Sequence, residues 1–156
     1  MIAGYELGER RRGRIPVAEY EAVVGRMLTR DWFTLDTCDT LTQLHLVESL
    51  VTAHPARYPS RGAAVRWLLD KAMDQVIAAC EASADTGSVR IADFLRQRRN
   101  GVTVVEIART WGISREYVSR TVSRRATQLV TNRVLALGRR TLVAQSSSET
   151  YGRRSA

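Results

Sequence analysis

The chain has 156 residues, 44% of them hydrophobic, which is enough apolar surface for a folded core. No apolar run approaches the roughly 18 residues of a membrane span, and none near the amino terminus is long enough for a signal peptide. We therefore expect a cytoplasmic protein with no membrane partner. The formal net charge of +8 and a pI near 10.5 favour an anionic partner.

The amino-terminal segment, residues 1–14, has no apolar set from which a core can form. Its basic residues are Arg10, Arg11, Arg12 and Arg14, with glycines among them. We expect a mobile basic arm. One interpretation is a solvated tail, and the other is an arm that follows a phosphate backbone or enters a DNA minor groove.

Residues 15–87 predict three helices. The first, Val17–Thr29, follows Pro16, which suits a first helical turn, the second follows the cap-forming residues 36–40, and the third, from about Arg61 to Ala82, is capped by Ser60. The expected buried faces are Val17, Tyr20, Val24, Met27 and Leu28 in the first helix; Leu41, Leu44, Val47, Leu50 and Val51 in the second; Val65, Leu68, Leu69, Ala72, Met73, Val76, Ile77 and Cys80 in the third. The third face is nearly two-sided, so we expect that helix to be central.

Residues 83–88, SADTGS, form the predicted linker. A fourth helix follows, which ends in basic residues and is stopped by Gly101. Its expected apolar residues are Val89, Ile91, Ala92, Phe94 and Leu95.

Residues 102–125, VTVVEIARTWGISREYVSRTVSRR, predict two short helices joined by a tight turn. Thr103 and Glu106 have the spacing of a capping box, so the first helix begins at Val104. Gly112 can adopt the left-handed conformation that ends this helix, and Ser114 caps the next one. The expected inward residues are Ile107, Ala108 and Trp111 in the first helix and Val118 and Val122 in the second.

This segment resembles the helix-turn-helix of bacterial and phage DNA-binding regulators. The matching residues are EIA at 106–108, the glycine four residues after that alanine, and ISREYVSR at 113–120. The resemblance covers about a sixth of the chain and implies a second helix that reads base edges in the major groove. Thr121 departs from the pattern, because the family keeps an aliphatic residue there and this chain has Val122 one position later. We therefore expect a slightly rotated recognition helix.

The resemblance assigns two sets of DNA contacts. The expected base-reading residues are Arg115, Glu116, Ser119, Arg120 and Arg124. The expected phosphate-binding residues are Arg98, Arg99, Thr103, Arg109, Ser114, Ser123 and Arg125. The alternative is an ordinary helical hairpin, which the caps and the glycine would fit equally well.

Charge distinguishes these two interpretations. Residues 15–87 contain six basic and ten acidic side chains, a net charge of about −4. Residues 88–140 contain twelve arginines and three carboxylates, a net charge of about +9. This concentration of arginine around the motif favours a polyanion as partner.

The recognition helix is expected to continue to Gly138, which is longer than reading a groove requires. The apolar residues of this extension are Leu129, Val130, Val134 and Leu137. Surplus apolar surface here or on the predicted helix at residues 61–82 favours a homodimer. The alternative is that the two stripes bury each other within one chain. Residues 141–156, which include SSS and GRRS, are expected to be a disordered tail.

A second, weaker resemblance covers more of the chain. Residues 88–120 are similar to the promoter-binding domain near the carboxyl terminus of bacterial sigma factors, and residues 40–51 and 60–77 are similar to their polymerase-binding helices. This resemblance implies RNA polymerase as a partner of the amino-terminal half. Against it, residues 15–87 are acidic and lack the basic and aromatic face that melts a promoter, with Trp67 the only tryptophan in the right neighbourhood.

Motifs for catalysis or cofactor binding are not evident. The soft metal ligands Cys38, His45, His54 and Cys80 are seven, nine and twenty-six residues apart, which matches no compact zinc motif. Buried or free thiols are the simpler interpretation, and His45 is expected to be a packing residue. The carboxylates Asp31, Asp36 and Asp39 are better explained by helix capping than by a nuclease-like metal site. We expect no enzyme activity and no catalytic, cofactor or metal site.

The sequence thus predicts an all-α protein in four segments: a mobile basic arm (1–14), an acidic helical module for dimerisation or partner binding (15–87), a helix-turn-helix DNA-binding domain with an extended last helix (88–140) and a disordered tail (141–156). The expected function is sequence-specific binding of double-stranded DNA in transcription regulation, as a homodimer. The alternatives are a sigma-factor-like or RNA polymerase adaptor protein, and a helical protein-interaction module without DNA specificity. RNA polymerase or another regulator is the expected further partner of the amino-terminal module.

Overall fold

The computed structural model describes residues 15–29 and 39–141. Within these two ranges the regular secondary structure is entirely helical, which confirms the predicted all-α class. The expected basic arm, the tail from residue 142 onward, Asp31, Asp36 and Cys38 lie outside the described residues.

The helices follow one another closely along the chain. In order they are α2 (Val17–Thr29), α3 (Asp39–Thr42), α4 (His45–Ala53), α5 (Arg61–Ala82), α6 (Thr86–Arg99), α7 (Val104–Trp111), α8 (Arg115–Tyr117), the π-helical turn η2 (Val118–Val122) and α9 (Ser123–Gly138). The predicted bounds of α2 and α5 and the predicted start of α7 are confirmed.

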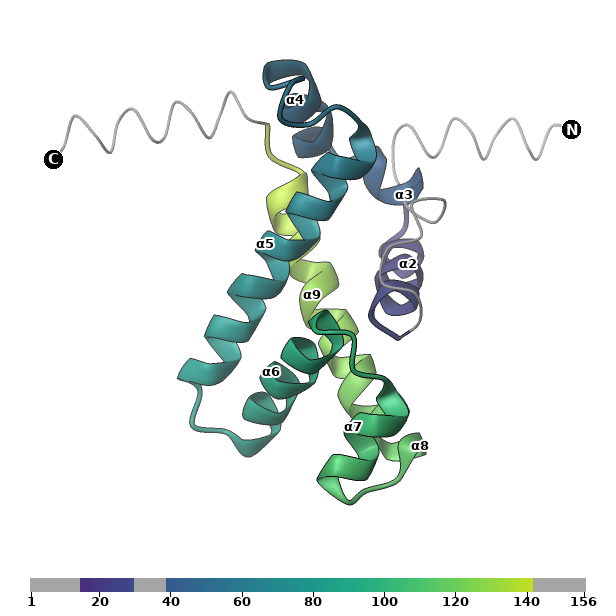
Figure 1. Cartoon of the computed structure of the whole chain (residues 1–156). Helices are drawn as coiled ribbons and strands as arrows, with labels where there is room; N and C mark the ends of the chain where they lie inside the picture. The colour runs from purple at the N-terminus through teal and green to yellow at the C-terminus, as the bar shows by residue number, and fades with distance from the viewer. Residues whose placement is uncertain (1–14, 30–38, 142–156) are drawn as a thin grey trace, which may run out of the picture.

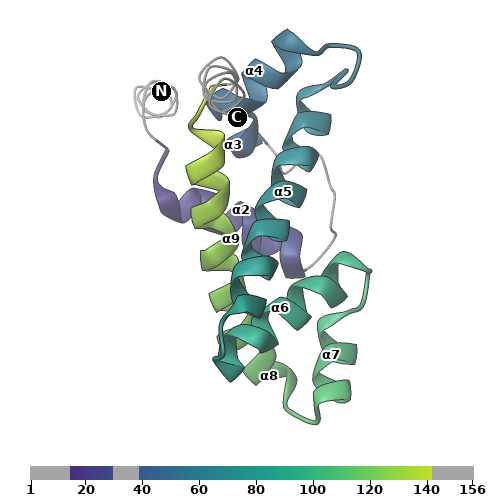
Figure 2. The ribbon, with the colours of Figure 1, turned by 90° about the vertical axis from the view of Figure 1, so that its left-hand side faces the viewer.

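Two long helices form the centre of the molecule. Figures 1 and 2 show α5 and α9 side by side and running in opposite directions, with α2 against α9, and α6 and α7 toward the end where α8 lies. All eight residues expected on the buried face of α5 are buried, and Val130 and Val134 of α9 are fully buried. Leu129 and Leu137 are partly buried against the same core. The stripes on which the dimer prediction rested are therefore intramolecular core.

The predicted second helix is interrupted. Leu44 has an extended backbone, with φ −71° and ψ 141°, which separates α3 from α4. In one uninterrupted helix Leu44 and Leu46 would lie on different faces, whereas the break lets both be buried. This gain in apolar burial is the physical reason for the difference from the prediction.

Two valines expected inside are exposed. Val17 is 44% exposed, and the buried residues nearby are Ile15 before the helix and Val23 within it. Val89 is 49% exposed, because the buried face of α6 passes through Ile91, Ala92, Phe94 and Leu95 instead. Both valines lie in or near the first turn of a helix, where little of the molecule covers them.

The predicted linker is shorter in the structure. Helix α5 ends at Ala82 and α6 begins at Thr86, capped by Asp85, whose Oδ2 accepts from the Ser88 amide at 3.1 Å. The domain boundary expected at residue 87 falls in the first turn of α6. Buried residues from α2 through α9 belong to one hydrophobic cluster.

Helix α9 ends at Gly138, as expected, and this glycine also has a packing role. It is the last residue of α9, and the chain continues with ordinary helical angles at Arg139, φ −81° and ψ −4°. A Cβ at Gly138 would lie 2.7 Å from Leu44 Cδ1 and 3.2 Å from Leu44 Cβ. The glycine therefore allows the end of α9 to approach the start of α4.

Candidate nucleic-acid interface

Helix α7 begins with the predicted capping box. The Thr103 hydroxyl accepts from the Glu106 amide at 3.1 Å, and Glu106 Oε1 accepts from the Thr103 amide at 3.1 Å. The Thr103 hydroxyl also donates to Glu106 Oε1 at 2.9 Å. The hydrogen bond from the Thr103 amide, and then that from its hydroxyl, lower the pKa of the Glu106 carboxyl. Ile107 and Ala108 are buried as expected, which fixes α7 against the core.

The turn after α7 has the predicted geometry. Gly112 is left-handed, with φ 70° and ψ 32°, and the Ile113 amide donates to the Ala108 carbonyl at 3.1 Å. Ser114 then caps α8, because its Oγ accepts from the Tyr117 amide at 3.0 Å. Local residues, one glycine and one serine cap, therefore determine this turn.

The helix after the turn continues from Arg115 to Gly138 with one π-helical turn, η2, in it. In η2 the Ser123 amide donates to the Val118 carbonyl, a spacing of five residues instead of four. Val118 and Val122 are buried, whereas Thr121 is exposed.

The expected base-reading residues share an exposed helical surface. Arg115, Glu116, Ser119, Arg120 and Arg124 are all exposed, and Tyr117, Thr121 and Arg125 lie exposed among them. The ion pairs seen in the described ranges include those of Arg61, Arg96 and Arg99, and none of them uses the four arginines of residues 115–125. We call residues 115–125 the arginine face.

Arg98 is not available to a phosphate, which corrects its assignment. It is 6% exposed, its Nε donates to the Leu28 carbonyl, and its Nη1 donates to the Val102 carbonyl at 2.7 Å. Burial lowers the pKa of this guanidinium. Arg98 thus joins the end of α2 to the segment before α7.

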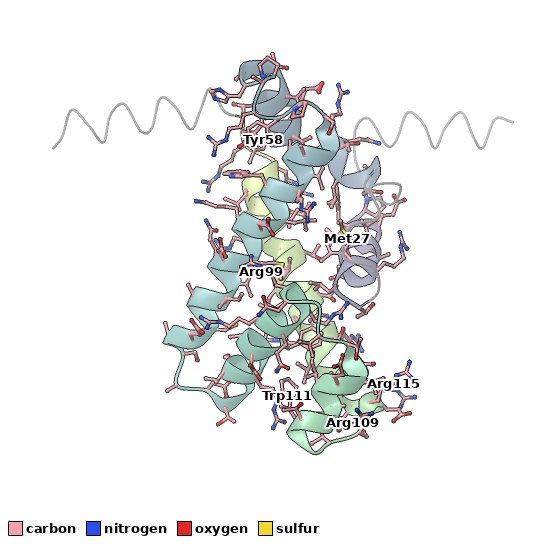
Figure 3. All side chains as sticks on the ribbon, viewed as in Figure 1. Met27, Tyr58, Arg99, Arg109, Trp111 and Arg115 are labelled. Atoms are coloured by element: carbon pink, nitrogen blue, oxygen red, sulfur yellow. The ribbon has the colours of Figure 1, made fainter. Side chains whose placement is uncertain are left out.

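Arg99 is bound to α5. Its Nη1 lies 2.7 Å from Asp74 Oδ1, and its Nη2 donates to the Asp70 carbonyl at 2.9 Å. Figure 3 shows Arg99 apart from Arg109, Trp111 and Arg115, which gather at the α7–α8 end. The structure therefore gives Arg99 a structural partner away from the arginine face.

Ser123 is 3% exposed and faces the core, which also removes it from the phosphate-binding set. The remaining members of that set, Thr103, Arg109, Ser114 and Arg125, are exposed. The Thr103 and Ser114 hydroxyls both accept from helix amides, but the Thr103 hydroxyl also donates to Glu106 Oε1 at 2.9 Å. The Ser114 hydroxyl therefore keeps a donor for a phosphate, whereas that of Thr103 is used within the capping box.

An open groove of about 680 Å³ lies beside the arginine face, between it and the first turns of α6. It is lined on the α6 side by residues 85–88, 90 and 91, and on the other side by residues 117, 120–122, 124, 125 and 128. We call it the α6 groove. It brings four arginines together, Arg90, Arg120, Arg124 and Arg125.

Arg90 is the functional candidate that the sequence did not identify. Its guanidinium lies 5.1 Å from the centre of the Trp111 ring, and the Trp111 Nε1 donates to Asp93 Oδ2 at 2.9 Å. These contacts hold α7 and α6 together, in a second pocket that Arg90, Asp93 and Trp111 line. The signal in the sequence was weak, because Arg90 is one basic residue in α6 and only the packing angle of that helix places it near residue 120.

Metal binding and membrane insertion have little support in the part of the chain that the structure describes. That part contains no group of three His, Cys, Asp or Glu side chains that could hold a metal ion. His45 is exposed rather than packed, His54 is also exposed, and Cys80 is a buried free thiol whose pKa burial raises. None of the helices at residues 15–29 and 39–141 is long and apolar enough to cross a membrane.

Comparisons of the chain with protein-family models, with curated proteins and with solved structures find no match.

Proposed function

We propose that the protein binds duplex DNA sequence-specifically through the arginine face and regulates transcription. The observation that carries the proposal is that Arg115, Arg120, Arg124 and Arg125 are exposed on one stretch of helix without a carboxylate partner in the described ranges. Duplex DNA presents one negative charge per about 1.7 Å of its axis. Its phosphates can therefore pair with arginines that have no carboxylate partner in the described ranges.

The shape of this region supports the same partner. Helix α8 lies at the end of the molecule opposite α4, so that the side of the helix away from the core is open to solvent (Figure 1). A helix with its side chains is about 10–12 Å across, and the major groove of B-DNA is about 12 Å wide. Residues 115–125 therefore fit into the major groove as one unit.

The side chains of the arginine face supply distinct contacts to base edges. Arg115 and Arg120 can donate two hydrogen bonds to guanine O6 and N7, and Glu116 can accept from cytosine N4. Ser119 and Arg124 extend the same surface along the helix. Arg109 and Arg125, with the Ser114 hydroxyl, would contact the phosphates on either side.

Selection of binding sites from a random duplex pool tests the proposal. We expect the wild type to enrich one motif and Arg120→Ala to lose preference at one base pair, at a cost of about 1–3 kcal/mol in binding free energy. The matched control is Arg61→Ala, which removes the same charge at the α4 end, where Arg61 pairs with Glu48 at 2.7 Å. It should retain the wild-type motif.

A pool without any enriched motif would instead support a protein-interaction module or a polymerase adaptor. An unchanged motif with Arg120→Ala would remove only that residue from the base-reading set.

The proposal includes the binding of two copies of the protein to one DNA site. A single recognition helix covers only about half a turn of DNA, and such regulators commonly bind two half-sites about 34 Å apart. The apolar stripes of α5 and α9 are core, so a dimer would use other surfaces. RNA polymerase or another regulator is the alternative partner of the amino-terminal half.

A further inference from the structure

We infer that the α6 groove holds the sugar–phosphate backbone of one DNA strand, with Arg90 and Arg125 as the phosphate contacts on its two walls. This inference rests on the proposed function, since it says where the DNA backbone lies when the arginine face occupies the major groove. Arg90 thereby becomes a DNA contact supplied by a helix outside the two-helix motif.

The first argument is geometric. A helix about 10–12 Å across nearly fills a major groove about 12 Å wide, so its two long sides face the two phosphate backbones. Tyr117, Thr121 and Arg125 are four residues apart and all line the α6 groove, so they form the row that faces α6. A strand that passes this row enters the α6 groove.

The second argument is charge. The α6 groove is lined by Arg90, Arg120, Arg124 and Arg125 and by a single carboxylate, Asp85. The Asp85 Oδ2 accepts from the Ser88 amide and from the Ser88 hydroxyl, both at 3.1 Å, so its charge is directed to the start of α6. The groove therefore carries a net positive charge.

The third argument is the fixed position of Arg90. Its guanidinium is held over the Trp111 ring at 5.1 Å, and Trp111 is in turn bonded to Asp93. A side chain that is already ordered loses less conformational entropy when it binds a phosphate. Arg96, on the same helix, differs because it pairs with Glu81 at 2.5 Å and does not line the α6 groove.

The test compares Arg90→Gln with Arg96→Gln by fluorescence anisotropy, on the selected duplex and on a scrambled duplex. Glutamine keeps a planar amide near Trp111 and removes the charge. We expect Arg90→Gln to weaken binding to both duplexes alike, by about threefold to tenfold, and to reduce the salt slope by about 0.9, as the loss of one phosphate contact requires. Arg96→Gln should bind as the wild type does.

A second variant has the opposite sign and so cannot be mistaken for misfolding. Asp85→Asn removes the one negative charge of the groove and keeps a good cap for α6. We expect it to bind both duplexes more tightly. A duplex with one neutral methylphosphonate identifies the phosphate concerned, because at that position the substitution weakens the wild type but not Arg90→Gln.

The outcomes separate the two proposals. A wild type that fails to bind duplex DNA overturns both of them. A wild type that binds and selects a motif, while Arg90→Gln equals Arg96→Gln and no methylphosphonate position couples to Arg90, overturns the groove assignment alone. That second result would leave an acidic protein segment as the occupant of the groove.

Discussion

Thr131 has a buried hydroxyl in the middle of α9. Its side chain is fully buried, and its Oγ1 has no hydrogen-bond partner among the described residues. A buried polar group without a partner costs about 1–3 kcal/mol, and valine has nearly the same shape without the hydroxyl. We expect Thr131→Val to raise the unfolding free energy by about 1 kcal/mol and the Tm by about 2–4 °C.

Thermal unfolding followed by circular dichroism measures this change. Thr110→Val, the same substitution at an exposed position of α7, is the control and should leave the Tm nearly unchanged. A Tm of Thr131→Val at or below that of the control would mean that the Thr131 hydroxyl is satisfied in solution.

At the residue scale, local contacts were predictable and distant ones were not. The capping box at Thr103 and the left-handed Gly112 depend on residues within one turn, and both are as expected. Arg98 resembled a surface residue in sequence but contacts the carbonyl of Leu28, seventy residues away. Arg90 was missed for the same reason, because its surroundings depend on how α6 packs.

At the element scale, alanine should have opposite effects on the unfolding free energy at two glycine positions. A Cβ at Gly25, inside α2, would meet Thr127 Cγ2 of α9 at 3.5 Å, an ordinary contact. Alanine is favoured over glycine in a helix by about 0.8–1.0 kcal/mol, so Gly25→Ala should stabilise the protein by up to about that amount. Gly138→Ala should destabilise it by about 1–3 kcal/mol, because the added methyl overlaps Leu44.

Urea unfolding of the two alanine variants checks this prediction, and each is the control of the other because the substitution is identical. A stable Gly138→Ala would show that Leu44 moves aside at little cost. A destabilised Gly25→Ala would show that α2 packs more closely on α9 than the 3.5 Å contact indicates.

Element bounds were predictable where strong local signals coincide with burial. Helix α5 has a serine cap and eight apolar positions at helical spacing, and its bounds are as expected. The break at Leu44 could not be predicted, because no glycine or proline lies there. It lets Leu46 be buried against other helices. The π-helical turn η2 likewise contains no glycine or proline that could predict it.

At the scale of the whole molecule, the packing of α6 against α5 brings acidic and basic side chains together. The carboxylates Asp74 and Glu81 of α5 pair with Arg99 and Arg96 of α6, at 2.7 Å and 2.5 Å. The acidic half of the sequence therefore neutralises part of the basic half. Among the arginines without a carboxylate partner in the described ranges, Arg120, Arg124 and Arg125 lie close together on η2 and the start of α9.

The central position of α9 leads to a prediction about Val134. This residue is fully buried, so a carboxylate there would be buried without a partner. We expect Val134→Asp to abolish cooperative unfolding, since a cost above about 3 kcal/mol is a large part of the stability of a domain. Arg133→Asp, one position earlier and exposed, should stay folded.

Sedimentation and circular dichroism together check the Val134 prediction. A folded, monomeric Val134→Asp beside a dimeric wild type would contradict the intramolecular core and restore α9 as a dimer interface. An unfolded Val134→Asp beside a folded Arg133→Asp would support the core.

The salt dependence of duplex binding tests the central claim most directly, because it counts the phosphates that the protein neutralises. Three arginines are assigned to them: Arg90, Arg109 and Arg125. With about three contacts at roughly −0.9 each, log affinity against log salt concentration should have a slope of about −3 for each bound copy of the protein. Arg61→Ala, at the α4 end, should have the same slope. A slope near zero for the wild type would contradict DNA binding by the arginine face.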